Sequence, residues 1–349
     1  MNLDLPLERL GRLLGEFMEP PCPTNPLPRH HPQAGSRQSL STAFVMNSSE
    51  PAKIESAKDF RLLAKDEAHL HATARHRVIE RGDFSVLIFR RQEAPVLFHE
   101  LCRQREIAFR LSGQGSGSAL DVTPEDDCYE QMVLWDRKNH AIAGAYRLGF
   151  AEEILNSRGI DGLYLRHMFD FDPEFFKRDP QALELTRSFV SPAYQKNNIA
   201  LALLWRGLGH IVVHRGINRM FGSVTIAADF AEPSRALITG WLARHRMHRP
   251  APLARALRPY PPGDDPILAA GGTIDILKPR IFDRRGSRKA LPPLLRHYLP
   301  LGASFHAFHR EASFGDALYC LLDVAVSTIP PAHRRRFLPE PSQGEGGRR

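Results

Sequence analysis

Two charged residues interrupt an otherwise apolar segment at residues 183–190, namely Glu184 and Arg187. Charges in such a segment are costly to bury unless they are paired or serve a function. A regular strand alternates its side chains between two faces, so residues three apart point in opposite directions. The two charges can therefore meet at one site only where a bulge distorts the strand. They form either a structural ion pair or a site in which Glu184 deprotonates an ammonium, so that the free amine can attack a thioester.

A second pair that could do chemistry lies four residues apart, at Arg105 and Phe109. On a helix this spacing places both side chains on one face. A cation beside an aromatic ring could hold a phosphate-bearing or acyl ligand. The alternative is a surface arginine beside a core phenylalanine, and spacing alone does not separate the two.

Three further patterns bear on catalysis. His167 and Asp172 have the H-x-x-x-x-D spacing of glycerolipid acyltransferases, but such a pair arises easily by chance among 16 histidines. Residues 195–200 precede a predicted helix, where backbone N–H groups could bind a pyrophosphate, yet they lack the glycines that allow close approach. The G-x-S-x-G, P-loop, H-E-x-x-H and dinucleotide-binding patterns are absent, which excludes several large enzyme classes.

The elements that must position these residues alternate between strand and helix patterns, which predicts a mixed α/β sheet protein. We expect a hairpin at its centre, a strand to helix to strand crossover after it, and residues 274–277 among the segments that complete the sheet. The predicted strands are 84–90, 131–135, 142–148, 183–190, 220–226, 304–308 and 318–327, and the predicted helices are 95–111, 199–214, 233–246 and 292–301.

Composition divides the chain into three parts. Residues 1–55 hold a short helical pattern at 5–17 and then six prolines between residues 20 and 32, which predicts a disordered N-terminal extension. Residues 60–328 form the predicted folded domain, with a basic insertion rich in proline and arginine at 244–270. Residues 330–349 have too little apolar content to pack, which predicts a disordered tail.

Charge and cysteine content limit the partners. The formal net charge is +8, with 39 arginines and 8 lysines, which fits nucleic acid, an anionic membrane surface or an acidic carrier protein. Four widely spaced cysteines without a C-x-x-C pair argue against both a disulfide framework and a zinc site. No apolar run reaches eighteen residues and no secretory signal is readable, so we expect a cytoplasmic location.

Four segments, taken in order, resemble one family. Residues 105–109 (REIAF) are similar to its R-x-x-x-F, and Asp126 lies where the family carries an acidic segment ending in His-Leu, here replaced by Gln131 and Met132. Residues 144–148 (GAYRL) are similar to G-T-Y-R-L, and residues 184–190 (ELTRSFV) closely resemble E-L-G-R-S-x-V. The chain thus resembles the GNAT-type N-acyltransferases, which include ornithine lipid synthases and hemolysin-like acyltransferases and are related to acyl-homoserine-lactone synthases.

The resemblance covers residues 84–325 and implies a GNAT-like fold and no metal or redox cofactor. It also implies an acyl-carrier-protein or acyl-CoA donor and an amino-acid acceptor such as ornithine. Carried over position by position, it implies catalytic roles for Glu184, Asp126 and Arg187 and substrate binding by Arg105, Phe109 and Arg147. The donor would be bound around the strand-to-helix junction, where the corresponding residues are Phe189, Val190, Gln195 and Trp205.

The first hypothesis is therefore N-acylation of an amino acid by a long-chain acyl carrier in aminolipid biosynthesis. A fatty product would partition into a membrane, so we also expect peripheral contact with an anionic inner membrane through the basic segment 244–258. No nucleic-acid partner is expected. Two alternatives stay open: an acetyl-CoA-dependent N-acetyltransferase of a small amine or protein, and a non-catalytic basic protein that binds membrane or nucleic acid.

Overall fold

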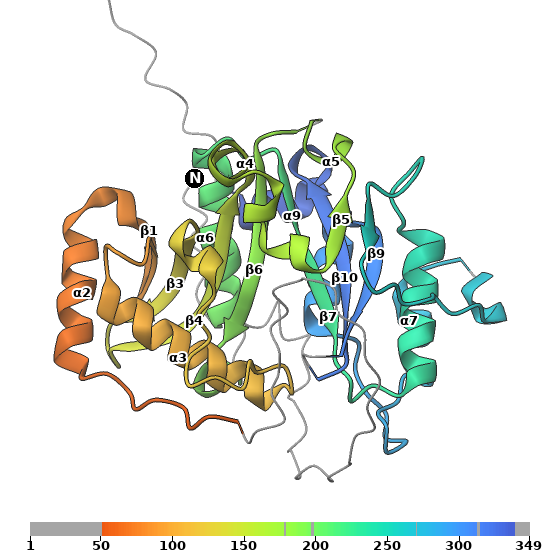
Figure 1. Ribbon diagram of the computed structural model, residues 1–349, viewed down its shortest axis with the longest axis horizontal. Helices are drawn as coiled ribbons and strands as arrows, with labels where there is room; N and C mark the ends of the chain where they lie inside the picture. Colours follow the sequence, from red (N-terminus) through yellow and green to blue (C-terminus); the bar gives the residue numbers. More distant parts are fainter. Residues whose placement is uncertain (1–50, 178, 197–198, 270, 313–314, 339–349) are drawn as a thin grey trace, which may run out of the picture.

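The computed structural model describes residues 51–338, with gaps at 178, 197–198, 270 and 313–314 (Figure 1). The predicted helix at 5–17, nearly all of the predicted extension and the tail beyond residue 338 lie outside the described residues.

One eight-stranded sheet organises the fold. Its spatial order is β1-β2-β3-β4-β6-β7-β10-β9, and every neighbouring pair is antiparallel except β6 and β7, which are parallel. The predicted mixed α/β sheet is confirmed. The strands are β1 Arg77–Arg81, β2 Phe84–Phe89, β3 Glu130–Asp136, β4 Ala141–Phe150, β6 Ala182–Val190, β7 Arg219–Ile226, β9 Ser304–Glu311 and β10 Ala317–Ala325.

Helices cover both faces of this sheet (Figure 1). On one face lie α2 Phe60–Ala72 and α3 Pro95–Leu111, with α4 Ala151–Arg158 and α5 Glu174–Lys177 beside them. On the other lie α6 Ile199–His214, α7 Glu232–His245 and α8 Pro293–Tyr298. The helices predicted at 95–111 and 199–214 begin and end as expected, because each has an apolar stripe that faces the sheet.

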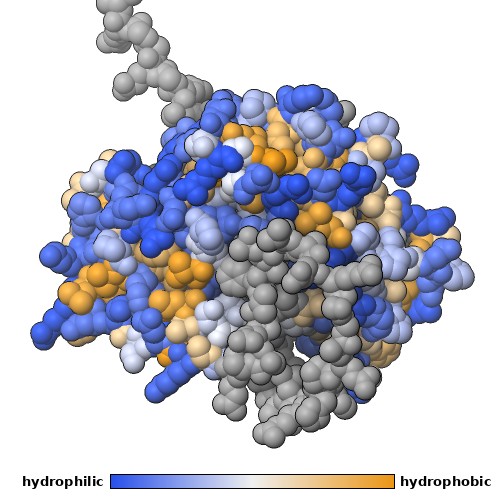
Figure 2. All heavy atoms as spheres, in the orientation of Figure 1, coloured by the Kyte–Doolittle hydropathy of each residue, from blue (hydrophilic) through white to orange (hydrophobic). Residues whose placement is uncertain are grey.

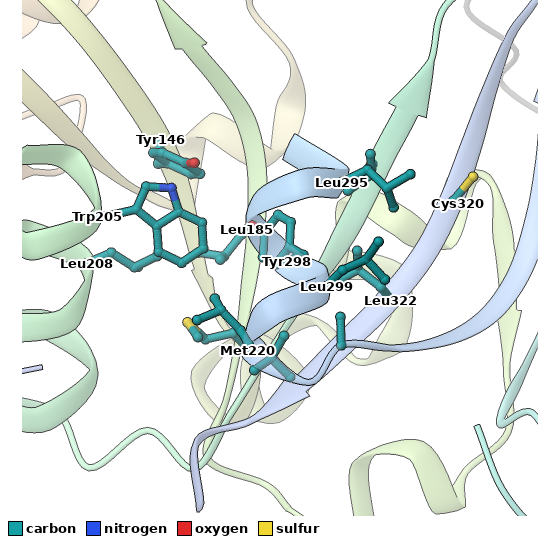
Figure 3. Close-up of a cluster of buried hydrophobic side chains, with 14 of the residues drawn as sticks. Tyr146, Leu185, Trp205, Leu208, Met220, Leu295, Tyr298, Leu299, Cys320 and Leu322 are labelled. Atoms are coloured by element: carbon teal, nitrogen blue, oxygen red, sulfur yellow. The ribbon is translucent and has the colours of Figure 1, made fainter. Parts of the chain in front are cut away.

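The larger apolar core lies under α6, α7 and α8. Figure 3 shows Tyr298 of α8 between Trp205 and Leu208 of α6 on one side and Leu295 of α8 on the other. Because α6 connects the two parallel strands and packs back onto them, the chain makes the crossover that a parallel pair requires.

Two segments differ from the sequence expectations. Residues 274–277 belong to the 3-10 helix Ile274–Arg280 instead of the sheet, and they pack through Ile274 and Leu277. Residues 331–337, expected in a disordered tail, form α9 Pro331–Phe337, whose Phe337 ring lies 5.7 Å from that of Trp205. A Cβ at Gly209 would collide with the Phe337 carbonyl, so glycine at this position allows α9 to contact α6.

The predicted basic insertion is tied to the domain by short elements. Within it, β8 Ala254–Ala256 pairs with β5 Phe169–Phe171, and Tyr260 and Leu268 are buried. Arg249, Arg255 and Arg258 are exposed. Figure 2 shows one face of the molecule as largely hydrophilic, with apolar groups in separate areas. No helix within residues 51–338 that the structure describes is long and apolar enough to cross a bilayer.

Candidate active site

A bulge in β6 brings Glu184 and Arg187 to one site. Ala145 of β4 pairs with Phe189 and Arg147 with Thr186, so β6 carries one extra residue across this interval. Arg187 has φ +50°, a left-handed conformation that residues other than glycine seldom adopt. As a result, Arg187 donates a hydrogen bond to the Tyr164 hydroxyl at 2.9 Å, and the Tyr164 N–H donates to Glu184 at 3.3 Å. The distortion that the sequence spacing requires is present.

A buried ion cluster stands beside this bulge. Asp126 lies 3.1 Å from Arg105 of α3 and 3.4 Å from Arg147 of β4, and all three side chains are 0% exposed. Thr123 completes the cluster, since its N–H donates to Asp126 at 2.9 Å and its hydroxyl accepts from Arg147 at 2.6 Å. Burial raises the pKa of Asp126, but Arg105 and Arg147 outweigh burial and hold that pKa below its usual range.

Two residues that depart from the family pattern take part in this cluster. Gln131, where the family carries histidine, donates to Asp126 at 3.2 Å and accepts from Arg105. Thr186, which replaces a glycine, accepts a hydrogen bond from Arg147 at 3.0 Å. Both substitutions therefore have hydrogen-bonding partners within the same network.

Glu184 is fully buried. Its carboxylate accepts from the Tyr129 hydroxyl, from the Leu165 N–H at 2.8 Å and from the Tyr164 N–H. Burial raises the pKa of Glu184, and the hydrogen bonds from Tyr129 and the backbone offset only part of that effect. In this arrangement Glu184 holds the segment at Tyr164 and Leu165 against β6.

Arg187 is the arginine of this network that keeps some exposed surface, about 11% of its side chain. Its guanidinium lies 3.1 Å from Asp121 and stands over the rings of Tyr164 and Phe109 at 4.7 and 5.8 Å. Burial lowers the pKa of Arg187, but Asp121, Tyr164, Tyr319 and Asp126 together outweigh burial and the net shift is upward. The side chain is therefore a permanent cation packed against two aromatic rings. The ring centroids of Phe109 and Phe189 lie 6.2 Å apart.

His167 contacts Glu125 instead of Asp172. Its Nε2 lies 2.7 Å from a Glu125 carboxylate oxygen, and the two side chains are 59% and 7% exposed. Asp172 accepts from the Glu174 N–H at 2.9 Å. The sequence pattern therefore paired His167 with the wrong carboxylate. The acidic residues 125–127 were the sequence signal that could have indicated Glu125 as the partner.

The residues predicted to bind the acyl donor lie in two places. Gln195 donates to the Val190 carbonyl at 2.9 Å, and Phe189 faces Phe109, so these three lie at the bulged end of β6. Trp205 instead faces the core on the other side of the sheet, where its ring lies 5.3 Å from that of Tyr298. The helical period of α6 predicts which of its residues are buried, but it does not predict on which face of the sheet the helix, and with it Trp205, lies.

The parallel pair β6–β7 separates beside the bulge. The ladder runs from Ala182–Arg219 to Leu185–Gly222, and within the described strands no further pair joins β6 to β7. The backbone of residues 186–190 is therefore not paired with β7, at the end of β6 that carries Arg187.

Three potential metal-binding side chains lie apart from this network, at His248, His306 and Asp323, with ligand atoms within 4.8 Å of one another. The Leu253 N–H donates to His306 Nδ1 at 3.1 Å, so neutral His306 carries its proton on Nε2, which faces Asp323 at 3.3 Å. His306 therefore lies between the Leu253 N–H and the Asp323 carboxylate.

Replacing Glu184 by glutamine tests its electrostatic state. A raised folded-state pKa stabilises the fold at acid pH, and that contribution is lost as the pH rises through the folded-state value. Glu184→Gln is neutral throughout, so we expect its urea midpoint to rise relative to wild type as the pH increases above about 4, the ordinary pKa of a glutamate. Parallel curves for the two proteins would show that Glu184 does not titrate differently in the folded state.

The chain is similar in sequence to several known proteins. Residues 104–206 match the acetyltransferase (GNAT) domain family. The chain is 34% identical over 191 residues to the glycine N(alpha)-acyltransferase of Bacteroides thetaiotaomicron, covering 51% of this chain and 57% of that protein. It is 29% identical over 186 residues to the L-ornithine N(alpha)-acyltransferase of Rhizobium meliloti, covering 53% of this chain and 54% of that protein. The chain thus spans less than two thirds of the length of either relative.

The chain also aligns with solved structures, among them a CoA-dependent acyl-homoserine lactone synthase, BjaI, with SAM and isopentyl-CoA. The alignment covers 73% of this chain and 90% of BjaI at 11% identity, with a TM-score of 0.36. The domain match contains Arg105, Asp126, Arg147, Glu184 and Arg187. Residues 104–206 of this chain are therefore similar to the acetyltransferase (GNAT) domain family.

Proposed function

We propose that this chain is an N-acyltransferase that moves an acyl group from a thioester to the α-amine of an amino acid. The observation that carries the proposal is the bulge at Arg187. It places an accessible cation next to strand backbone that β7 leaves unpaired. The named acceptors of the relatives, glycine and ornithine, give the substrate class.

The donor would bind along residues 186–190. An extended arm that ends in a thioester can add to unpaired strand backbone through main-chain hydrogen bonds. A backbone N–H at the bulge would then donate to the thioester carbonyl oxygen as negative charge develops on it. Acyl-CoA and acyl carrier protein present the same phosphopantetheine arm, and the +8 charge of the chain favours the acidic carrier.

The acceptor would bind at Arg187. A guanidinium presents two parallel N–H donors to a carboxylate, and the α-carboxylate of an amino acid fits this fork. Asp121 and Tyr164 fix the guanidinium, and Phe109 closes one side. The acceptor amine is thereby held next to the donor strand, and this orientation lowers the barrier to its attack on the thioester.

The remaining residues predicted at the site would act by positioning. Arg105, Asp126 and Arg147 have no exposed surface, so we assign them to joining α3, β4 and the turn that precedes β3. Glu184 is likewise enclosed and would hold Tyr164 in contact with Arg187. These assignments replace the direct substrate contacts that the family resemblance implies.

The product's destination follows from its chemistry. An amino acid that carries a long acyl chain is an amphiphile and partitions into a bilayer. We therefore place the enzyme at the cytoplasmic surface of the inner membrane, in aminolipid synthesis. Exposed arginines of the insertion, such as Arg249 and Arg255, would contact anionic lipids there.

A donor and acceptor matrix tests the proposal. The purified chain would be incubated with palmitoyl-loaded carrier protein, palmitoyl-CoA or acetyl-CoA, each with glycine, ornithine, lysine or serine, and the lipid extract analysed by mass spectrometry. We expect a long-chain N-acyl amino acid, which is absent when enzyme is omitted. Turnover with acetyl-CoA alone would favour the acetyltransferase alternative. No product from any donor, with steeply salt-dependent DNA binding, would favour a non-catalytic basic protein.

A further inference from the structure

Acyl transfer to an amine requires a group that accepts the amine's proton. An amino acid is an ammonium ion at neutral pH and becomes nucleophilic only after one proton leaves. The carboxylates of Asp126 and Glu184 are enclosed by their own partners, with no exposed surface. Proton transfer therefore calls for another titratable side chain on this face of the sheet.

His167 meets the geometric requirements. Its imidazole is more than half exposed, while the Glu125 carboxylate that binds Nε2 at 2.7 Å is almost fully buried. A carboxylate on Nε2 retains the proton there in the neutral ring and leaves the lone pair on Nδ1. This is the arrangement of an oriented base, with one nitrogen anchored and the other free to accept.

The same imidazole adjoins the proposed acceptor site. Its ring lies 6.0 Å from that of Tyr164, in an edge-on contact, and Tyr164 binds Arg187. Glu125 precedes Asp126, so the anchoring carboxylate lies on the same turn as the buried ion cluster. The histidine and the arginine are therefore held by one set of elements.

We propose that His167, oriented by Glu125, is the general base that deprotonates the acceptor ammonium. This inference rests on the proposed N-acyltransferase function. His167 Nδ1 takes one proton from the ammonium, and the neutral amine attacks the thioester carbonyl carbon. The C–N bond forms and the C–S bond breaks. The thiolate leaves and takes the second proton lost by nitrogen, while His167 releases its proton to solvent.

The charges around His167 suit this role. Glu125 raises the pKa of His167 through the hydrogen bond, burial lowers it, Glu184 raises it and Arg147 lowers it, and the net direction is upward. The rate should therefore increase with pH as the protonated imidazole loses its proton. The reciprocal effect is visible in Glu125: burial raises its pKa, but the bond from His167 and other hydrogen bonds bring that pKa down to about 2.

Removal of the imidazole and its replacement from solution test the proposal. We expect His167→Ala to lower kcat/KM for the amino acid by about 10²- to 10³-fold, to flatten the rise of rate with pH, and to regain part of its activity in buffer containing imidazole. Glu125→Gln should shift that rise to lower pH, because the carboxylate no longer raises the pKa of the ring. His214→Ala removes an exposed histidine on the opposite face of the sheet and is the matched control.

The possible outcomes distinguish a failure of the His167 assignment from a failure of the proposed N-acyltransferase function. Wild-type activity with an unchanged rate and pH profile in His167→Ala would overturn the base assignment and leave the N-acyltransferase proposal standing. The base assignment would also be overturned if imidazole failed to restore activity to His167→Ala and the pH profile of Glu125→Gln matched that of the wild type. Absence of transfer by the wild-type protein would overturn both.

Discussion

Asp126→Asn is expected to lower the free energy of unfolding by about 3–5 kcal/mol, which is a large part of the stability of an ordinary domain. The substitution removes the negative charge that lies 3.1 and 3.4 Å from two buried guanidinium groups. Arg105 and Arg147 would then lose the carboxylate that pairs with both of them inside the fold. Urea denaturation at neutral pH, followed by circular dichroism, measures the effect.

A surface ion pair provides the control for Asp126. Asp275 and Lys278 lie 3.2 Å apart, with about half of each side chain exposed, so Asp275→Asn should cost about 0–1 kcal/mol.

The stability that Asp126 contributes depends on pH with a definite sign. Because the folded-state pKa of Asp126 is lowered, its contribution is present above the unfolded-state pKa and is lost as the pH falls through the folded-state value. Equal losses in the two variants would show that the buried cluster contributes no more than a surface pair.

Arg187→Lys is expected to raise the KM for the amino acid about 10- to 100-fold, the range for losing a hydrogen bond to a charged group. Lysine keeps a cation beside Asp121 but cannot offer the two parallel N–H donors of the guanidinium. The fold should therefore persist, while the acceptor carboxylate loses its bidentate partner. Steady-state kinetics with the acceptor and the donor varied separately measure the effect.

Arg235→Lys is the matched control for Arg187→Lys. Arg235 is also buried and paired with acidic residues, Glu232 and Asp316, but it lies on α7, across the sheet. We expect it to leave both KM values unchanged. An acceptor KM that stays at the wild-type value in Arg187→Lys would rule out carboxylate binding at this position, and a rise confined to the donor KM would move Arg187 to the donor site.

The elements of the central fold were predictable because their patterns are local. An apolar stripe specifies α3, and two strand-like segments on either side of the polar turn at Lys138 and Asn139 specify the hairpin of β3 and β4. The sequence made the bulge a condition for Glu184 and Arg187 to act at one site, and the structure contains that bulge. The signal for α9 was weak, because one aromatic residue that packs on a distant helix leaves no periodic pattern.

The partners within the site were not predictable, because they come from segments distant in the sequence. The Tyr129 hydroxyl and the Leu165 N–H satisfy Glu184 from 55 and 19 residues away. The spacing identified Glu184 as chemically important, but only packing shows that it is enclosed. His167 was recognised as a candidate for a reason that the structure does not support, since its carboxylate partner is 42 residues away.

The separation of β6 from β7 has a consequence for how the protein tolerates change. If the donor's arm pairs with β6 there, the donor is bound through backbone C=O and N–H groups. Every amino acid has the C=O group, and every one except proline has the N–H group. Side chains along that edge could then vary during evolution with little loss of donor binding, while the acceptor would stay tied to the few side chains around Arg187. Relatives built in this way would share one donor and diverge in the amine that they acylate.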